Sequence, residues 1–177
     1  MKNKKIILGI TGSIASFRVP DFALKVVNIG ADLSVILTDY AQNFITPVVI
    51  NTINNNKTYT NESNLTQPML HIELARMADV ILIMPATAHV IAKLANGFCD
   101  DLLSTVCVAT KAPIILVPAM NHVMWANSIV QENITKLQNH GVEIWGPISG
   151  TQMCREQGIG NMMASNDIIN KLIDVLS

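Results

Sequence analysis

The sequence predicts one α/β domain in which a parallel β-sheet is wound on both faces by helices. Short β-rich runs alternate along the chain with segments of helical periodicity, the pattern of parallel strands joined by crossover helices. Two of these runs, residues 78–84 and 113–118, are almost continuously apolar, as expected of strands buried on both faces. The length of 177 residues fits a single domain, residues 1–177, without a linker or an internal repeat.

In the first half of the chain, each expected element has a local reason. Residues 6–10 form an apolar run, and the turn after it leads into a helix over 16–29 that ends at Gly30. Residues 33–37 are a second strand, followed by Thr38 and Asp39 at a helix start. Residues 51–68 are rich in Asn, Thr and Ser and lack periodicity, so a long loop is expected there.

The second half continues the alternation. After the third strand at 78–84, helices are expected over 90–95 and 102–109, then the strand at 113–118. A helix over 129–140 is followed by Gly141 and by a strand at 142–145. Residues 146–161 contain several glycines and are expected to form a loop. Ser165 is expected to cap a closing helix over 165–176.

Composition and charge exclude several classes of protein. With 50% hydrophobic and 14% charged residues, the chain can bury enough surface to fold. Twelve Lys and Arg against thirteen Asp and Glu leave no positive field for nucleic acid. The mean hydropathy of +0.36 is high, but the longest apolar runs, 80–86 and 114–120, contain Pro and are too short to span a membrane. The apolar surplus therefore indicates a buried core, a subunit interface or both.

Targeting signals and metal motifs are not expected. The first residues carry lysines but no long apolar stretch, so we expect no signal peptide. Three cysteines without a paired spacing favour a reducing, cytoplasmic setting. Cys99 and Cys107 are expected on helix faces in the core. The four histidines lack the spacing of a metal motif, and we expect no metal.

The unusual loops all follow expected strands: 11–16, 38–41, 85–89, 118–125 and 146–161. Ligands of such sheets bind at the carboxyl ends of the strands. The first turn, with Gly12 and Ser13, suits a phosphate at a helix start, although a tight turn without a ligand is equally compatible. It lacks the dinucleotide fingerprint, and the second strand ends in Leu37 and Thr38 without an acid, which favours a mononucleotide over NAD. Thr38 either adds a hydroxyl to this pocket or caps a helix.

Two segments carry a resemblance to a known family. Residues 85–103 read PATAHVIAKLANGFCDDLL, and residues 118–125 read PAMNHVMW, a complete P-x-M-N-x-x-M-W motif. With the matches at the first turn and at His71, the chain resembles the flavin-dependent cysteine decarboxylases from its first strand to about residue 163. The resemblance implies a flavodoxin-like, Rossmann-like fold, bound FMN, and a homotrimer or an assembly of trimers.

The resemblance also implies roles for particular residues. His71 would be the catalytic base, and Asn121 would bind the substrate carboxylate, with Ala119 and Met124 as further substrate contacts. FMN would be held by Gly12, Ser13, Ile14, Thr38, Thr87, Ala88 and Ala119. Apart from the family, His71 in front of an amphipathic helix would be read as structural and Asn121 as a turn residue. Met120 and Met124 are compatible with pocket walls and equally with the core. His89 and His122 are expected on the surface or the pocket rim.

Residues 146–162 decide between branches of the family. They resemble the flap of the enzymes that decarboxylate 4′-phospho-N-pantothenoylcysteine to 4′-phosphopantetheine, and Cys154 matches their proton donor. Arg155 stands where that flap has Gly, and Asn161 stands where Arg is usual; Arg155 could replace the lost charge. The expected activity is therefore this step of coenzyme A synthesis on a small phosphorylated substrate, without nucleic acid or membrane.

Two alternatives remain. A peptidyl-cysteine decarboxylase of lantibiotic biosynthesis would act on the C-terminal Cys of a precursor peptide and would lack the flap Cys. A non-enzymatic FMN-binding regulator need not keep His71, Asn121 and Cys154 together. The chain ends where bifunctional bacterial enzymes continue into a ligase, so we expect either a separate ligase or a longer natural protein.

Overall fold

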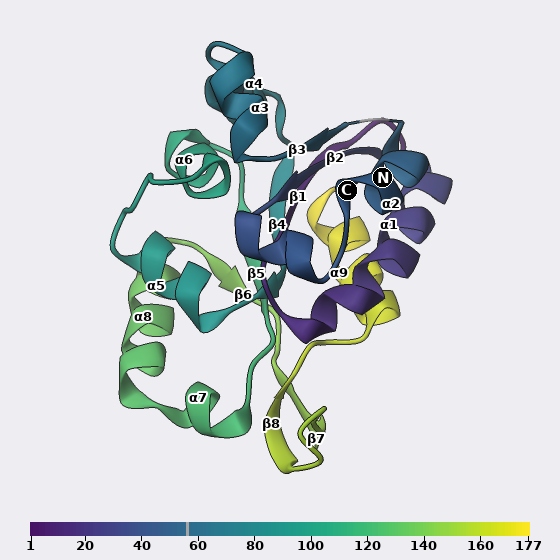
Figure 1. The fold of residues 1–177 in the computed structure, drawn as a ribbon. Coiled ribbons are helices and arrows are strands. Elements are labelled where there is room, and N and C mark those ends of the chain that lie inside the picture. The colour runs from purple at the N-terminus through teal and green to yellow at the C-terminus, as the bar shows by residue number, and fades with distance from the viewer. Residues whose placement is uncertain (56) are drawn as a thin grey trace.

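A six-stranded parallel sheet forms the centre of the molecule (Figure 1). The computed structural model describes residues 1–55 and 57–177. The strands lie in the order β3-β2-β1-β4-β5-β6, with the bounds β1 Lys5–Ile10, β2 Asp32–Leu37, β3 Thr58–Tyr59, β4 Val80–Ala86, β5 Ile114–Pro118 and β6 Glu143–Ile144. All five neighbouring pairs are parallel. The predicted doubly wound α/β sheet is confirmed, and each of the five expected strands is present.

Helices cover both faces of the sheet (Figure 1). One face packs against α1 (Val19–Asn28), α2 (Pro47–Asn54) and α9 (Ser165–Val175). The other packs against α4 (Leu70–Met77), α5 (Ala88–Ala95), α6 (Leu102–Ala109) and α8 (Ser128–Asn139). Successive strand residues alternate between the two cores: Ile6 and Leu8 face the first, and Ile7 faces the second. Burial of each such side chain contributes about 1.5–3 kcal/mol, so the sheet is a rigid base for the loops at its edge.

The strand order reverses between β1 and β4. From β1 the chain runs outward through β2 to β3, then returns to add β4, β5 and β6 on the other side. The loops that follow β1 and β4 therefore diverge and leave a crevice at the carboxyl ends of the strands. The Thr11 hydroxyl, just after β1, donates a 2.6 Å hydrogen bond to the carbonyl of Pro85 in β4. This bond joins the two strands at the crevice.

The expected loop at residues 51–68 is wrong in part, because the segment contains short regular elements. It holds the end of α2, then β3, then α3 (Asn61–Thr66), while Asn56 lies outside the described residues. Pro47 starts α2, and Asn55 ends it in the left-handed conformation, with φ 56°. Thr60 and Ser63 form a reciprocal capping box that starts α3. The sequence contains these local start and end signals, but the segment has no apolar periodicity that would indicate a helix or a strand.

The expected loop at residues 146–161 is also wrong: it contains an antiparallel two-stranded ribbon that projects from the domain (Figure 1). Its strands are β7 (Ile148–Thr151) and β8 (Gln157–Asn161). We call residues 148–161 the ribbon. It packs on α7 (His122–Ala126), the short helix after β5.

The helix ends and the cysteine positions agree with the sequence predictions only in part. The first helix is divided into a 3-10 helix, η1 (Ile14–Arg18), and α1, and another 3-10 helix, η2 (Asp39–Asn43), follows β2. Gly30 and Gly141 follow helices with φ 95° and 84°, which confirms both helix ends. Ala164, not Ser165, is the N-cap of α9. Cys107 is buried as expected, but Cys99 is exposed and lies between α5 and α6.

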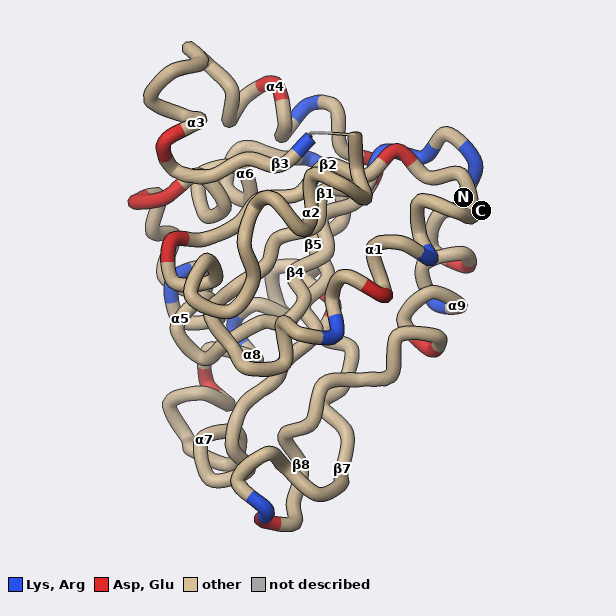
Figure 2. The backbone as a smooth tube through the Cα atoms, turned by 45° about the vertical axis from the view of Figure 1, so that its right-hand side comes forward, with Lys and Arg blue, Asp and Glu red and all other residues tan. Residues whose placement is uncertain are grey.

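Charged residues of both signs are interspersed along the backbone (Figure 2). Within residues 1–55 and 57–177, no helix is long and apolar enough to cross a membrane. The same residues contain no cluster of three or more His, Cys, Asp or Glu side chains that could hold a metal ion.

Candidate functional site

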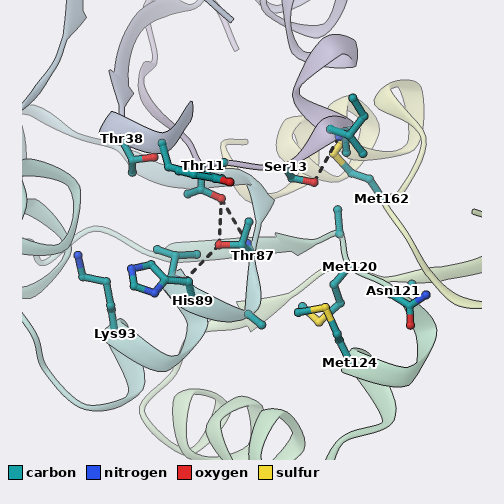
Figure 3. Close-up of a pocket in the computed structure, with 18 of the residues that line it drawn as sticks. Thr11, Ser13, Thr38, Thr87, His89, Lys93, Met120, Asn121, Met124 and Met162 are labelled. Carbon is teal, nitrogen blue, oxygen red and sulfur yellow. Dashed lines mark hydrogen bonds between the residues drawn. The ribbon is translucent and has the colours of Figure 1, made fainter. Parts of the chain in front are cut away.

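A cavity of about 820 Å³ opens at the carboxyl ends of β1, β4 and β5. Its walls come from the loops after these strands and after β2, and from the ribbon (Figure 3). Ten of the predicted site residues line it: Gly12, Ser13, Ile14, Thr38, Thr87, Ala88, Ala119, Asn121, Met124 and Cys154. Segments that are far apart in the sequence thus meet around one space, whose volume is in the range of cofactor sites.

The turn after β1 is tightly built. Ser13 is the N-cap of η1, and its hydroxyl accepts a 3.3 Å hydrogen bond from the Ala15 amide. The Ser16 hydroxyl donates to the Thr11 carbonyl at 3.0 Å. A Cβ atom on Gly12 would lie 2.1 Å from Cδ1 of the Tyr40 ring. A side chain at this position would collide with Tyr40, so glycine lets the turn pack closely against the residues after β2.

Threonine hydroxyls join the turn to the neighbouring loops (Figure 3). The amide of Thr87 donates to Thr11 Oγ1 at 3.3 Å, and Thr87 Oγ1 accepts from the Val90 amide as the N-cap of α5. Thr38 caps η2 by accepting from the Ala41 amide at 3.3 Å, and it also lines the cavity. The two interpretations of Thr38 are therefore compatible in this structure.

A partly buried ion-pair cluster forms another wall, which the sequence reasoning missed. Lys93 Nζ lies 2.6 Å from Asp100 and also contacts the Asp101 carboxylate. Burial by itself would lower the pKa of Lys93, but hydrogen bonds from its ammonium to Asp100 and Asp101 outweigh burial and raise it. Burial would likewise raise the pKa of Asp101, but hydrogen bonds from Lys93 and Ser104 lower it. The available signal was one lysine on a helix followed by two adjacent acids that precede the next helix.

Methionine side chains form an apolar wall of the cavity. Met120 and Met124 line it, as the pocket interpretation expected, and Met153 and Met162 join them from the ribbon and the residue after it. Methionine is polarizable and adapts its shape, so such a wall suits a flat aromatic ligand.

Asn121 has a divided role at the mouth of the cavity. Its Oδ1 accepts a 2.8 Å hydrogen bond from the Val123 amide and caps α7, as the turn interpretation expected. Its Nδ2 points the other way and donates to Glu156 Oε2 at 2.8 Å, with Cys154 Sγ at 3.5 Å. The amide group is thereby fixed through one atom, and its donor faces the ribbon.

Two ribbon residues that the sequence reasoning missed hold this arrangement. Gln152 accepts from the His122 amide at 3.1 Å and donates to the Met120 carbonyl at 3.3 Å, so it clamps the backbone on both sides of Asn121. Glu156 accepts from Asn121 and from the Cys154 thiol, whose sulfur is 3.2 Å away. The hydrogen bond from Asn121, followed by that from Cys154, lowers the pKa of Glu156.

The turn of the ribbon departs from the family pattern. Arg155 takes up φ 67°, so this residue retains a conformation that favours glycine although it is not one. Its side chain is exposed and does not line the cavity, which does not support the expectation that Arg155 replaces the missing arginine. Asn161, at the other departure, donates to the Thr151 carbonyl at 3.1 Å and braces the ribbon.

His71 lies apart from the other predicted residues. It stands within the first turn of α4, not in front of a helix as expected, and it does not line the cavity. Its Nδ1 is 3.3 Å from Asn64 Oδ1. His89 is an exposed residue at the cavity wall, and His122 is half-buried beside the ribbon, so both lie on the surface or rim as expected.

Comparison with known proteins identifies the family. The Flavoprotein family matches residues 1–177, and the chain belongs to it. The coenzyme A biosynthesis bifunctional protein CoaBC of Haemophilus influenzae is 42% identical over 182 residues, covering 100% of this chain and 45% of the relative. The Escherichia coli protein of the same name is 38% identical over 178 residues, which cover 98% of this chain and 43% of that relative. The chain thus spans less than half the length of these curated relatives.

Solved structures agree with this assignment. A PPC decarboxylase mutant complexed with pantothenoylaminoethenethiol superposes with a TM-score of 0.89 and 26% identity, covering 97% of both chains. The FMN binding protein AtHal3 superposes with a TM-score of 0.85 at 25% sequence identity, and the match covers 97% of this chain and 96% of AtHal3. The peptidyl-cysteine decarboxylase EpiD superposes with a TM-score of 0.84 at 25% sequence identity, and the match covers 97% of this chain and 99% of EpiD. The flavodoxin-like fold expected from the resemblance is confirmed.

Proposed function

We propose that the chain is an FMN-dependent decarboxylase that converts 4′-phospho-N-pantothenoylcysteine to 4′-phosphopantetheine. The observation that carries this proposal is the meeting of Asn121 and Cys154 at the mouth of a cavity that can hold a flavin. Its support also comes from the CoaBC relatives and from the PPC decarboxylase structure.

The described residues fit FMN. Gly12, Ser13 and Thr38 line the cavity and suit the phosphate end, since backbone amides and hydroxyls can bind an anion without an excess of basic residues. Thr87, Ala88 and Ala119, together with the methionine wall, would hold the flat ring. When bound, FMN supplies a reversible acceptor for the hydride on the carbon next to the substrate sulfur, and this makes loss of CO₂ possible.

The protein residues orient the substrate and move protons. Asn121 Nδ2 binds the carboxylate of the cysteine moiety, and as a neutral donor it does so without strongly stabilising the charge that leaves as CO₂. His71 acts as the base for the substrate thiol, directly or through its charge. Cys154 then gives its proton to carbon of the enethiolate, which leaves a thioaldehyde. Return of the hydride that bound FMN would have accepted earlier would reduce the thioaldehyde carbon, so the product is a saturated thiol. A peptidyl-cysteine decarboxylase would release the enethiol and would not need Cys154.

This site requires more than one copy of the chain, because His71 is not at the cavity of its own chain. Two exposed apolar side chains, Ile14 and Tyr40, line the cavity. Further exposed apolar side chains follow them along the chain: Phe17 on η1, Phe44 just after η2 and Val48 on α2. Others, Leu65 and Met69, flank His71 on another part of the surface, and Leu65 is 85% exposed. Contact between two different patches is heterologous, and it forms a ring where the rotation between copies closes. We propose that it does so as a homotrimer or an assembly of trimers.

Localisation is proposed on chemical grounds. The free thiols of Cys99, Cys107 and Cys154 fit a reducing compartment, and Cys154 must stay reduced to give up a proton. We therefore assign the reaction to the cytoplasm.

The proposed function is tested by the choice of substrate. The FMN-loaded protein is incubated with 4′-phospho-N-pantothenoylcysteine and, separately, with a peptide that ends in Cys, and the products are identified by mass. We expect CO₂ release and a saturated thiol from the first substrate only. Conversion of the peptide to an enethiol would instead show that the chain is a peptidyl-cysteine decarboxylase. If neither substrate reacted, the result would favour a non-enzymatic FMN-binding regulator.

A further inference from the structure

The carboxylate of Glu156 lies where the carboxylate of the proposed substrate would bind. Its Oε2 accepts a 2.8 Å hydrogen bond from Asn121 Nδ2, the donor that the proposed function assigns to the substrate. The same oxygen lies 3.2 Å from Cys154 Sγ and 3.7 Å from His122 Nδ1. One carboxylate therefore engages the proposed carboxylate-binding group and the proposed proton donor together.

We propose that Glu156 is a specificity-determining residue that competes with the substrate carboxylate for Asn121. This inference rests on the proposed function. Both N–H groups of Asn121 Nδ2 are engaged, one by Glu156 Oε2 and the other by Cys154 Sγ, and Oδ1 cannot donate. A substrate carboxylate therefore gains the stronger of these two donors only after Glu156 withdraws. Withdrawal also removes the nearer of the two acceptors of the Cys154 thiol and leaves only Gln152 Oε1 at 3.7 Å, so the proton donor becomes more available when a carboxylate has bound.

The position of Glu156 allows this exchange. It follows Arg155 at the turn of the ribbon, outside both hydrophobic cores, and its side chain is 54% exposed. A contact this exposed to water is weak, so a ligand carboxylate of similar chemistry can replace it. A buried pair would instead have held the site closed.

The exchange separates substrate from product. After CO₂ leaves, the product has no carboxylate to hold Asn121, and Glu156 returns to it. The contact therefore lowers affinity for ligands that carry the carboxylate and leaves affinity for the decarboxylated product unchanged. Gln152 keeps its two hydrogen bonds around Asn121 in either arrangement, since it uses backbone groups of Met120 and His122.

Calorimetry on the FMN-loaded protein tests the proposal. The two ligands are 4′-phospho-N-pantothenoylserine, which keeps the carboxylate but has no thiol to react, and 4′-phosphopantetheine, which has no carboxylate. In Glu156→Ala, the serine analogue should bind about two- to fivefold more tightly, because an exposed charge-assisted contact has been removed. Glu156→Gln should move in the same direction by less, and 4′-phosphopantetheine should be unaffected in both variants.

Glu132→Gln is the matched control, since it removes one exposed carboxylate on α8 away from the cavity. It should bind both ligands as the unmodified protein does. Unchanged or weaker binding of the serine analogue in both Glu156 variants would overturn the proposal, as would equal tightening of both ligands. The unmodified protein is first assayed with the cysteine substrate: absence of decarboxylation overturns the proposed function, whereas normal decarboxylation with unchanged affinities overturns the role of Glu156 alone.

Discussion

Lys93 and Asp101 show how single residues stabilise the wall of the cavity. The Asp101 side chain is 15% exposed; it pairs with Lys93 and also caps α6 by accepting from the Ser104 amide at 2.7 Å. A buried charge that loses its partner is costly, because it stays out of water without compensation. Asp101 thus stabilises both the ion pair and the helix start.

Asp101→Asn should lower the free energy of unfolding by about 2–4 kcal/mol near neutral pH, because it weakens the pair with Lys93 and the cap of α6. Urea unfolding followed by circular dichroism measures the change. Asp100→Asn is the matched control. Because Asp100 is 62% exposed, this substitution should lower the free energy of unfolding by less than about 1 kcal/mol. Equal losses in the two variants would contradict this assignment.

The same pair gives a pH dependence with a defined sign. The pKa of Asp101 is lowered from its usual 3.8 in the folded protein, so its contribution is present above that value and is lost as pH falls through the lower, folded pKa. The difference in stability between the unmodified protein and Asp101→Asn should therefore be constant from pH 5 to 7 and shrink below about pH 4. A difference that persists undiminished at pH 3 would rule out the ion pair as its cause.

At the scale of elements, the ribbon is the part that sequence patterns described least well. Its strands, ISGT and QGIGN, contain few apolar residues and no strict alternation, so composition alone indicates a loop. The pairing depends instead on long-range contacts. The Met120 amide donates to the Gly160 carbonyl at 3.0 Å, and a Cβ atom on Gly160 would lie 2.2 Å from the Met120 carbonyl oxygen. Gly160 lets the ribbon dock against the loop that carries Asn121.

Gly160→Ala should reduce kcat/KM for the proposed substrate by about tenfold or more, because a methyl group there pushes the ribbon, with Cys154, away from Asn121. Steady-state kinetics measure the effect. Gly150→Ala is the control within the same ribbon: its Cβ would meet only the end of the flexible Asn161 side chain, which can move aside. The account fails at this scale if the two variants have the same activity.

At the scale of the whole molecule, the sheet could be predicted because its main strands are apolar runs. Such runs are buried whichever side chains pack against them. The two-residue strand β3 and the short helix α3 could not, because they depend on neighbours and caps more than on periodicity. Ten of the predicted site residues line one cavity, as expected from the rule that loops converge at strand ends, while their roles stay predictions. The separation of His71 from the cavity could not be predicted, since it depends on the packing of distant elements.

Complementation tests the proposed assembly. His71→Asn and Asn121→Asp should each be nearly inactive, because one lacks the base and the other places a negative charge beside the substrate carboxylate. Co-expressed in equal amounts, they should recover about one quarter of normal activity, since about that fraction of sites would combine an intact cavity with a neighbour's His71. Purified assemblies are assayed after size-exclusion chromatography. Hybrids as inactive as either parent would mean that His71 and Asn121 act within one chain.

In the proposed reaction this chain releases a saturated thiol because Cys154 protonates the decarboxylated intermediate. The most direct test is the mass of the product that Cys154→Ser forms from 4′-phospho-N-pantothenoylcysteine. The account predicts that CO₂ is released and that the enethiol accumulates, with two hydrogens fewer than 4′-phosphopantetheine, while the unmodified protein yields 4′-phosphopantetheine itself. Normal formation of 4′-phosphopantetheine by Cys154→Ser would contradict the role of Cys154 and the assignment that depends on it.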